Sequence, residues 1–279
     1  MSIVTFWSNG KEETGKTLSI VAIATHIAIQ HNYKVLIVST GYKDKTLGNC
    51  FWKEQKIKKN LGLFGPNTNN AIEDGVAGLL RAIRSKRATP EGMKNYTKPV
   101  LKDRLEVLEA FQGDPEDYDE IRNSYMDVIS LANNYYDLVL IDLDKELGEE
   151  NCNAIQEASN VIVANVNQRL SSINEFMEIR ETMPILKSQK ALILIGRYDK
   201  FSKYTVKNIT RYLGEKNKVS AVPYNTLFFE ACEEAGTIDL FFAFAKIKDS
   251  DDRNLLFLNE VKRAADNIIY RIQDLTMKM

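Results

Sequence analysis

Residues 10–17 read GKEETGKT, a stretch whose residue types and spacing suit the binding of a phosphate chain. Gly10 and Gly15 allow the backbone to turn its N–H groups inward toward an anion. In such a loop the lysine, here Lys16, reaches the β and γ phosphates of a nucleotide, and the next hydroxyl, here that of Thr17, binds Mg²⁺. The spacing therefore predicts a nucleotide-binding phosphate loop.

Two predicted elements flank this loop. SIVTFWS (2–8) is typical of a strand, and TLSIVAIATHIAIQ (17–30) is typical of a helix that is apolar on most faces. The N-terminus of a helix favours an anion because its free N–H groups and its dipole face the ligand. A preceding strand and a following helix are the context that distinguishes a true phosphate loop from a chance match in a surface turn.

KVLIVS (34–39) and five later apolar runs predict further strands. Helical patterns separate them, which favours a mainly parallel sheet with helices on both faces and a ligand site at the carboxyl ends of the strands. The later runs are RLEVLEA (104–110), DLVLID (137–142), NVIVANV (160–166), ALILIG (191–196) and VSAVP (219–223). We predict one three-layer α/β domain over residues 1–279.

The composition limits the classes of function. With 37 basic and 38 acidic side chains in 279 residues, no overall charge draws the chain to nucleic acid or to a membrane. Three widely separated cysteines, Cys50, Cys152 and Cys232, fit neither a disulfide framework nor a CxxC metal site. The chain opens on a strand pattern rather than a secretion signal, and no stretch has the length and apolar character of a membrane span. We expect a cytoplasmic protein.

Lys11, directly after the first glycine of the loop, matches the signature lysine of the deviant phosphate loops of the ParA/MinD family. The sequence resembles that family in three further segments, in the same order along the chain. YDLVLIDLD (136–144) is similar to its Walker B strand, LIGRYDKFSKYTVKNI (194–209) to its segment near the adenine, and VSAVPYNTLFFEACEEAGTIDLFF (219–242) to the stretch that closes the base pocket. TadZ/CpaE-like members, which place secretion or pilus machinery, have a similar adenine segment.

The resemblance implies a P-loop NTPase fold, bound ATP or ADP with Mg²⁺, and a homodimer in which Lys11 reaches the partner's nucleotide. Thr17 and Asp142 are then the metal ligands, and the expected catalytic residues are Lys11, Lys16, Asp142 and Asp144. The implied cofactor-binding residues are Gly10, Lys11, Thr14, Gly15, Lys16, Thr17 and Leu18 in the loop, with Arg197, Pro223, Tyr224 and Asn225 near the base.

The loop departs from the family pattern at Glu12 and Glu13, where the family usually has two glycines. Three interpretations remain open. Both side chains face solvent, or they form part of a dimer face and pair with a basic group of the partner, or they repel the γ-phosphate so that ADP or no nucleotide is favoured.

A second departure concerns hydrolysis. The family carries Asp-x-Asp after its second strand, and the later aspartate orients the attacking water. Here the matching residues are Ser39, Thr40 and Gly41. Asp144, Asp44 or Glu146 could replace the lost carboxylate, or these are ordinary solvated loop charges. Because phosphoryl transfer depends on positioning, we expect binding with slow hydrolysis.

Residues 56–103 are polar and basic, and we predict a helical insertion there. The basic residues of 81–104 could touch DNA phosphates, as in ParA partition proteins, or form a solvated face or a protein-docking surface. They are Arg81, Arg84, Lys86, Arg87, Lys94, Lys98, Lys102 and Arg104.

A C-terminal helix is predicted at 252–276, with one apolar stripe formed by Val261, Ala264, Ile268, Ile272 and Leu275. Such a stripe is typical of a core-facing helix. A membrane tether of the MinD kind is the alternative, which the mixed charges on the other face disfavour.

The resemblance implies a nucleotide-dependent dimerising switch that hydrolyses ATP slowly and localises a larger assembly of the TadZ kind together with an unidentified protein partner. Partners would recruit it from the cytoplasm to the membrane or the cell pole. A nucleotide-independent pseudo-ATPase scaffold and a ParA-like DNA partition ATPase are the alternatives.

Overall fold

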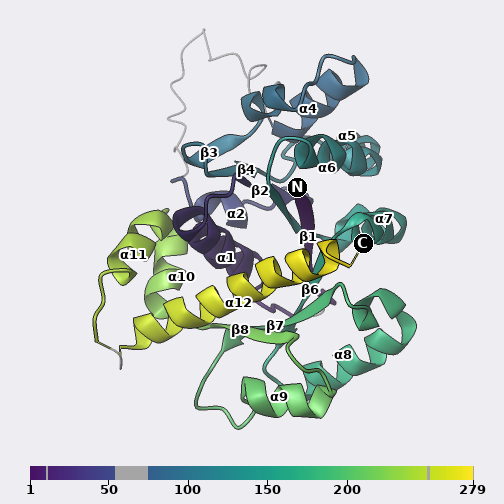
Figure 1. Ribbon diagram of the computed structural model, residues 1–279. Helices are drawn as coiled ribbons and strands as arrows, with labels where there is room; N and C mark the ends of the chain where they lie inside the picture. The colour runs from purple at the N-terminus through teal and green to yellow at the C-terminus, as the bar shows by residue number, and fades with distance from the viewer. Residues whose placement is uncertain (11, 54–74, 250–251, 279) are drawn as a thin grey trace.

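The computed structural model describes residues 1–10, 12–53, 75–249 and 252–278. Among them is one eight-stranded sheet in the order β3-β4-β2-β5-β1-β6-β7-β8 (Figure 1). All neighbouring strands are parallel except β3 and β4, which are antiparallel. The strands are β1 (Ser2–Trp7), β2 (Val35–Ser39), β3 (Lys98–Leu101), β4 (Leu105–Leu108), β5 (Leu138–Asp142), β6 (Val161–Asn167), β7 (Ala191–Tyr198) and β8 (Val219–Pro223).

Helices cover both faces of the sheet and make the three layers that the sequence predicts (Figure 1). One face packs against α1 (Lys16–Gln30), α10 (Thr226–Glu233), α11 (Thr237–Phe244) and α12 (Arg253–Thr276), with the short α2 (Thr46–Asn49) nearby. The other face packs against α4 (Gly75–Arg84), α5 (Pro115–Ile121), α6 (Tyr125–Asn133), α7 (Glu149–Ala158), α8 (Leu170–Thr182) and α9 (Val206–Leu213). The fold class is therefore the predicted one.

Helix α1 is the central element of its layer. It lies between the sheet and α12, so Ile20, Val21, Ile23, Ala24 and Ile27 are all fully buried. This position explains why its sequence is apolar on most faces instead of showing one apolar stripe.

The structure differs from the sequence-based expectation at 56–103. Residues 98–101 form the antiparallel edge strand β3, where a helical insertion was expected. The strand is four residues long, begins with Lys98 and Pro99, and shows a register shift after Pro99, all of which are usual at the edge of a sheet and weaken the strand pattern. Residues 75–84 of this range are helical, and 56–74 lie outside the described residues.

Helix α12 directs its apolar stripe into the core. Val261, Ala264 and Ile268 are buried, and Ile272 and Leu275 pack against them while partly exposed. Burial of this face favours the core interpretation over a membrane tether. No helix of the described residues is both long enough and apolar enough to cross a membrane.

Candidate functional site

The loop between β1 and α1 has the backbone shape that its glycines suggest. Gly10 and Gly15 have φ angles of 70° and 69°, in the left-handed region that favours glycine. Gly15 directly precedes α1, so the free N–H groups of the first helical turn face the loop. Lys11 lies outside the described residues.

Lys16, Thr17 and Asp142 meet where this loop enters α1. The Lys16 Nζ atom lies 2.8 Å from Oδ1 of Asp142, and the Thr17 hydroxyl donates to Oδ2 at 2.7 Å. Lys16 also donates to the carbonyl of Leu143. Parallel pairing of β1 with β5 sets Phe6 opposite Asp142, which brings the end of β5 beside the loop.

This cluster suits a magnesium-bound nucleotide. Mg²⁺ prefers oxygen ligands, and the Thr17 hydroxyl and the buried Asp142 carboxylate present theirs within hydrogen-bonding distance of one another. Lys16 lies beside them as the cation for a phosphate chain. The structure thus brings together the predicted metal ligands and the predicted phosphate-binding lysine.

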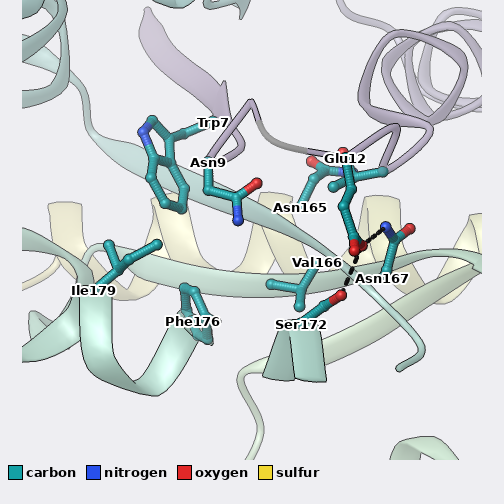
Figure 2. Close-up of a pocket in the computed structure, with 10 residues that line it drawn as sticks. Trp7, Asn9, Glu12, Asn165, Val166, Asn167, Ser172, Phe176 and Ile179 are labelled. Carbon is teal, nitrogen blue, oxygen red and sulfur yellow. Dashed lines mark hydrogen bonds between the residues drawn. The ribbon is translucent and has the colours of Figure 1, made fainter. Parts of the chain in front are cut away.

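The Glu12 side chain points toward the end of β6 and the start of α8. Its Oε2 atom accepts hydrogen bonds from Asn167 Nδ2 and from Ser172 Oγ, both at 2.7 Å (Figure 2). The Arg169 guanidinium lies 3.8 Å from Oε1. The bonds from Asn167 and Ser172, in that order, lower the pKa of Glu12 below its ordinary value.

Glu13, in contrast, has a side chain that is 93% exposed, with the Arg197 guanidinium 3.4 Å from its Oε2. The interpretation that both loop glutamates face solvent agrees with the structure for Glu13. Glu12 is exposed as well, but its carboxylate is also hydrogen-bonded to Asn167 and Ser172.

A small pocket lies beside the loop, between it, β6 and α8 (Figure 2). Trp7 and Phe176 line its apolar side, whereas Asn9, Thr14 and Asn165 line its polar side. Asn165 is 2% exposed, and among the described residues its amide atoms have no hydrogen-bond partner. The pocket beside the loop therefore contains a buried amide without a hydrogen-bond partner among the described residues.

The end of β7 supports the other side of the loop. A Cβ atom added at Gly196 would overlap the carbonyl oxygen of Thr14, so the loop packs directly on that glycine. The next residue, Arg197, has a left-handed φ of 52°, and the β7–β8 register shifts at this point. Its Cγ atom lies 3.1 Å from the position that a Cβ on Gly15 would occupy. The Arg197 side chain therefore lies across the phosphate loop at Gly15. Leu18, the last predicted loop residue, packs against the hydrophobic core around α1.

The residues predicted near the base gather at the ends of β7 and β8. Tyr198 pairs with Pro223, and the Tyr224 N–H donates to the Tyr198 carbonyl at 3.0 Å. Tyr224 is 54% exposed. Asn225 caps α10 by accepting from the N–H of Phe228 at 2.9 Å, and its Nδ2 donates to a neighbouring asparagine side chain. The Asn225 amide is therefore already hydrogen-bonded within the protein on both its oxygen and its nitrogen. Its contact with a base stays a prediction.

Two candidates for the lost switch carboxylate, Asp44 and Asp144, lie on either side of Gly41. A Cβ on Gly41 would lie 3.4 Å from Asp44 Cβ and 3.7 Å from Asp144 Oδ2. Each aspartate accepts a backbone N–H bond of 2.8 Å, Asp44 from Thr46 and Asp144 from Glu146. The roles of these carboxylates in hydrolysis stay predictions.

Sequence reasoning missed a support of this region. The Thr40 hydroxyl donates to the Asp142 carbonyl at 3.2 Å and accepts from the Asp144 N–H at 2.8 Å. The buried Tyr118 hydroxyl donates to the Thr40 carbonyl at 2.7 Å. Burial, followed by the nearby Asp144 charge, raises the pKa of Tyr118. No motif surrounds Tyr118, so no sequence signal could have identified it.

Some residues of the basic segment 81–104 are bound within the fold. Arg104 donates to the carbonyls of Ala28 at 3.3 Å and His31 at 2.5 Å. Lys98 pairs with Glu109. These contacts reduce the charge available to DNA phosphates, and DNA binding stays untested.

The fold is that of the ParA/MinD-type P-loop ATPases. A ParA family ATPase from Chlorobium tepidum superposes with a TM-score of 0.68 at 14% identity, covering 95% of this chain and 98% of that one. MinD from Pyrococcus horikoshii, complexed with Mg-ADP, gives 0.62 at 16% identity, covering 96% and 95%. The MinC:MinD cell division protein complex of Aquifex aeolicus gives 0.62 at 14%, covering 97% and 96%. Neither a protein-family model nor a curated protein matches the sequence.

Proposed function

We propose that this chain binds ATP or ADP with Mg²⁺ through the loop at residues 10–17 and acts as a nucleotide-dependent switch. The meeting of Lys16, Thr17 and Asp142 at the start of α1 carries the proposal. In P-loop proteins these groups bind the β and γ phosphates, the metal ion and the shell of the metal, respectively. A fold neighbour complexed with Mg-ADP supports the same assignment.

Hydrolysis by this site is expected to be slow. Ser39, Thr40 and Gly41 supply no carboxylate where the resemblance expects the water-orienting aspartate. The carboxylates of the nearby Asp44 and Asp144 each already accept a hydrogen bond from a backbone N–H group. The rate of phosphoryl transfer depends on groups that position the attacking water. We therefore expect this site to bind nucleotide but to hydrolyse it slowly.

The switch would act as a homodimer that places or organises a larger assembly, with Lys11 reaching across the dimer and an unidentified protein as partner. The resemblance to TadZ-like proteins motivates this role. A neighbour that is a MinC:MinD complex supports the idea of a protein partner. The protein would be cytoplasmic and recruited by its partners to the membrane or the cell pole.

Titration calorimetry with Mg-ATP and Mg-ADP tests the nucleotide site. Wild type is compared with a Glu12→Gly, Glu13→Gly double variant, and Lys16→Ala serves as the binding-deficient control. Binding by wild type that Lys16→Ala removes supports the proposal. Binding that appears only in the double variant would mean that the glutamates have converted the fold into a scaffold.

Light scattering after size exclusion, with and without Mg-ATP, tests the switch. ATP-dependent dimerisation is the expected result. A constant oligomeric state, with or without nucleotide, would favour the scaffold. Salt-sensitive DNA binding would instead favour a partition ATPase.

A further inference from the structure

Lys145 lies over the first glycine of the phosphate loop. Its Nζ atom donates to the Gly10 carbonyl at 3.3 Å. Its Cδ atom lies 2.8 Å from the position that a Cβ on Gly10 would occupy, so the aliphatic part of the side chain packs on the loop backbone. The Lys145 side chain is exposed, and its ammonium donates to the Gly10 carbonyl. Among the described residues, no carboxylate forms an ion pair with this ammonium.

The backbone around Lys145 is held firmly. Lys145 begins the 3₁₀ turn Lys145–Leu147, which the Asp144 side chain caps by accepting from the Glu146 N–H at 2.8 Å. The Asp144 N–H in turn donates to the Thr40 hydroxyl at 2.8 Å, and Leu147 is fully buried. The Cα position of Lys145 relative to the loop is thus set by the fold, although its side chain is long.

Two cations flank the loop at opposite ends. Arg197 crosses Gly15 and belongs to the strand end that also carries Tyr198 and the predicted base-binding residues. Lys145 crosses Gly10 and follows Asp142 by three residues along the chain. If Asp142 helps to hold Mg²⁺ on the phosphate chain, as the acidic residue of P-loop proteins does, the residues that follow it would lie near the terminal phosphate.

We propose that Lys145 binds the terminal phosphate of ATP and makes this site distinguish ATP from ADP. This inference rests on the proposed function. A compact ammonium suits a phosphate oxygen, and charge-assisted bonds of this kind are stronger than neutral ones. The positive charge of Lys145 at the loop also favours the approach of a polyanion.

Calorimetry on the full chain tests the inference with Mg-ATP and Mg-ADP on wild type, Lys145→Ala and Lys145→Arg. Lys145→Ala should weaken ATP binding about tenfold and change ADP binding less than about twofold, because ADP lacks the phosphate concerned. Lys145→Arg should recover part of the ATP affinity, because it keeps the charge.

Lys190→Ala is the matched control, because the Lys190 ammonium also donates to one backbone carbonyl, that of Glu157, at 3.3 Å, far from the loop. It should leave both affinities unchanged. Equal loss of ATP and ADP affinity in Lys145→Ala, or no loss, would overturn the inference while the proposed function stands. Wild type that binds neither nucleotide would overturn both. Melting curves of each variant verify that it is folded.

Discussion

The carboxylate of Glu12 accepts a hydrogen bond from the hydroxyl of Ser172 at 2.7 Å, so the phosphate loop is bound to the first turn of α8, 160 residues away along the chain. Asn167 donates to the same oxygen at 2.7 Å. A residue that replaces a glycine of the family pattern therefore ties the loop to the neighbouring strand and helix. Its charge is held by donors at the end of β6 and the start of α8.

Glu12→Gln should lower the melting temperature at neutral pH, because two charge-assisted hydrogen bonds become neutral ones. Glu13→Gln is the control at the adjacent position, and its exposed side chain predicts almost no change. Thermal melts of the three proteins check this. Equal melting temperatures for wild type and Glu12→Gln would contradict the tether.

The same contact predicts a pH dependence. The folded protein lowers the pKa of Glu12 below its ordinary value of 4.5. The carboxylate thus contributes stability above about that pH, and the contribution is lost as the pH falls through the lower folded value. Urea unfolding should show a difference between wild type and Glu12→Gln at pH 7 that shrinks as the pH falls below about 4.5. A difference that grows on acidification would contradict this sign.

Gly196→Ala should displace the phosphate loop, because the new methyl group would overlap the Thr14 carbonyl oxygen. We expect nucleotide affinity to fall at least about tenfold, since loop N–H groups must be placed accurately to bind phosphate. Calorimetry on the folded variant measures it. Gly236→Ala is the control, because its added Cβ would meet no atom closer than 3.8 Å. Unchanged affinity in Gly196→Ala would show that the loop does not depend on this contact.

Lys16→Ala should abolish nucleotide binding and should also lower the free energy of unfolding of the unliganded protein. The buried Asp142 would lose its ion pair with Lys16, which can cost about 3 kcal/mol when a charge remains buried without a partner. Calorimetry and urea unfolding measure the two effects separately. Retained nucleotide affinity would mean that the loop assignment is wrong.

Tyr118→Phe should destabilise the fold by about 1 kcal/mol, because it leaves the buried Thr40 carbonyl without the Tyr118 hydroxyl. Tyr125→Phe supplies the control. The Tyr125 hydroxyl is buried without a hydrogen-bond partner among the described residues, so its removal should be neutral or stabilising. Urea unfolding of both variants decides. A larger loss in Tyr125→Phe would contradict the assignment.

The layers of the fold could be predicted because their signals are local. The strands before and after the loop are apolar runs of nearly their full length, and Gly15, Lys16 and Thr17 follow the phosphate-loop spacing between a strand and a helix. Strand β3 could not be predicted in this way, because Lys98 and Pro99 at a sheet edge carry no alternating pattern.

The supporting contacts of the site could not be predicted because they join distant parts of the chain. Glu12 meets Ser172, and Tyr118 meets Thr40, only after parallel strands have brought their ends to one edge of the sheet. Side chains of Glu and Tyr occur at many surface positions, so their types give no hint of a partner. Asp44 and Asp144 were selected from their places at strand ends, and the sheet does bring them together around Gly41.

Helix α1 is enclosed by the sheet and by α12, and its buried residues leave it no room to shift. The two side chains that would hold phosphate and metal, Lys16 and Thr17, are therefore mounted on the first turn of a helix that is packed between the sheet and α12. If the proposed switch operates, we expect its change of shape in segments that contact the loop or its lysine, namely the end of β5 and the start of α8. A partner that distinguishes the nucleotide states would then bind at these segments.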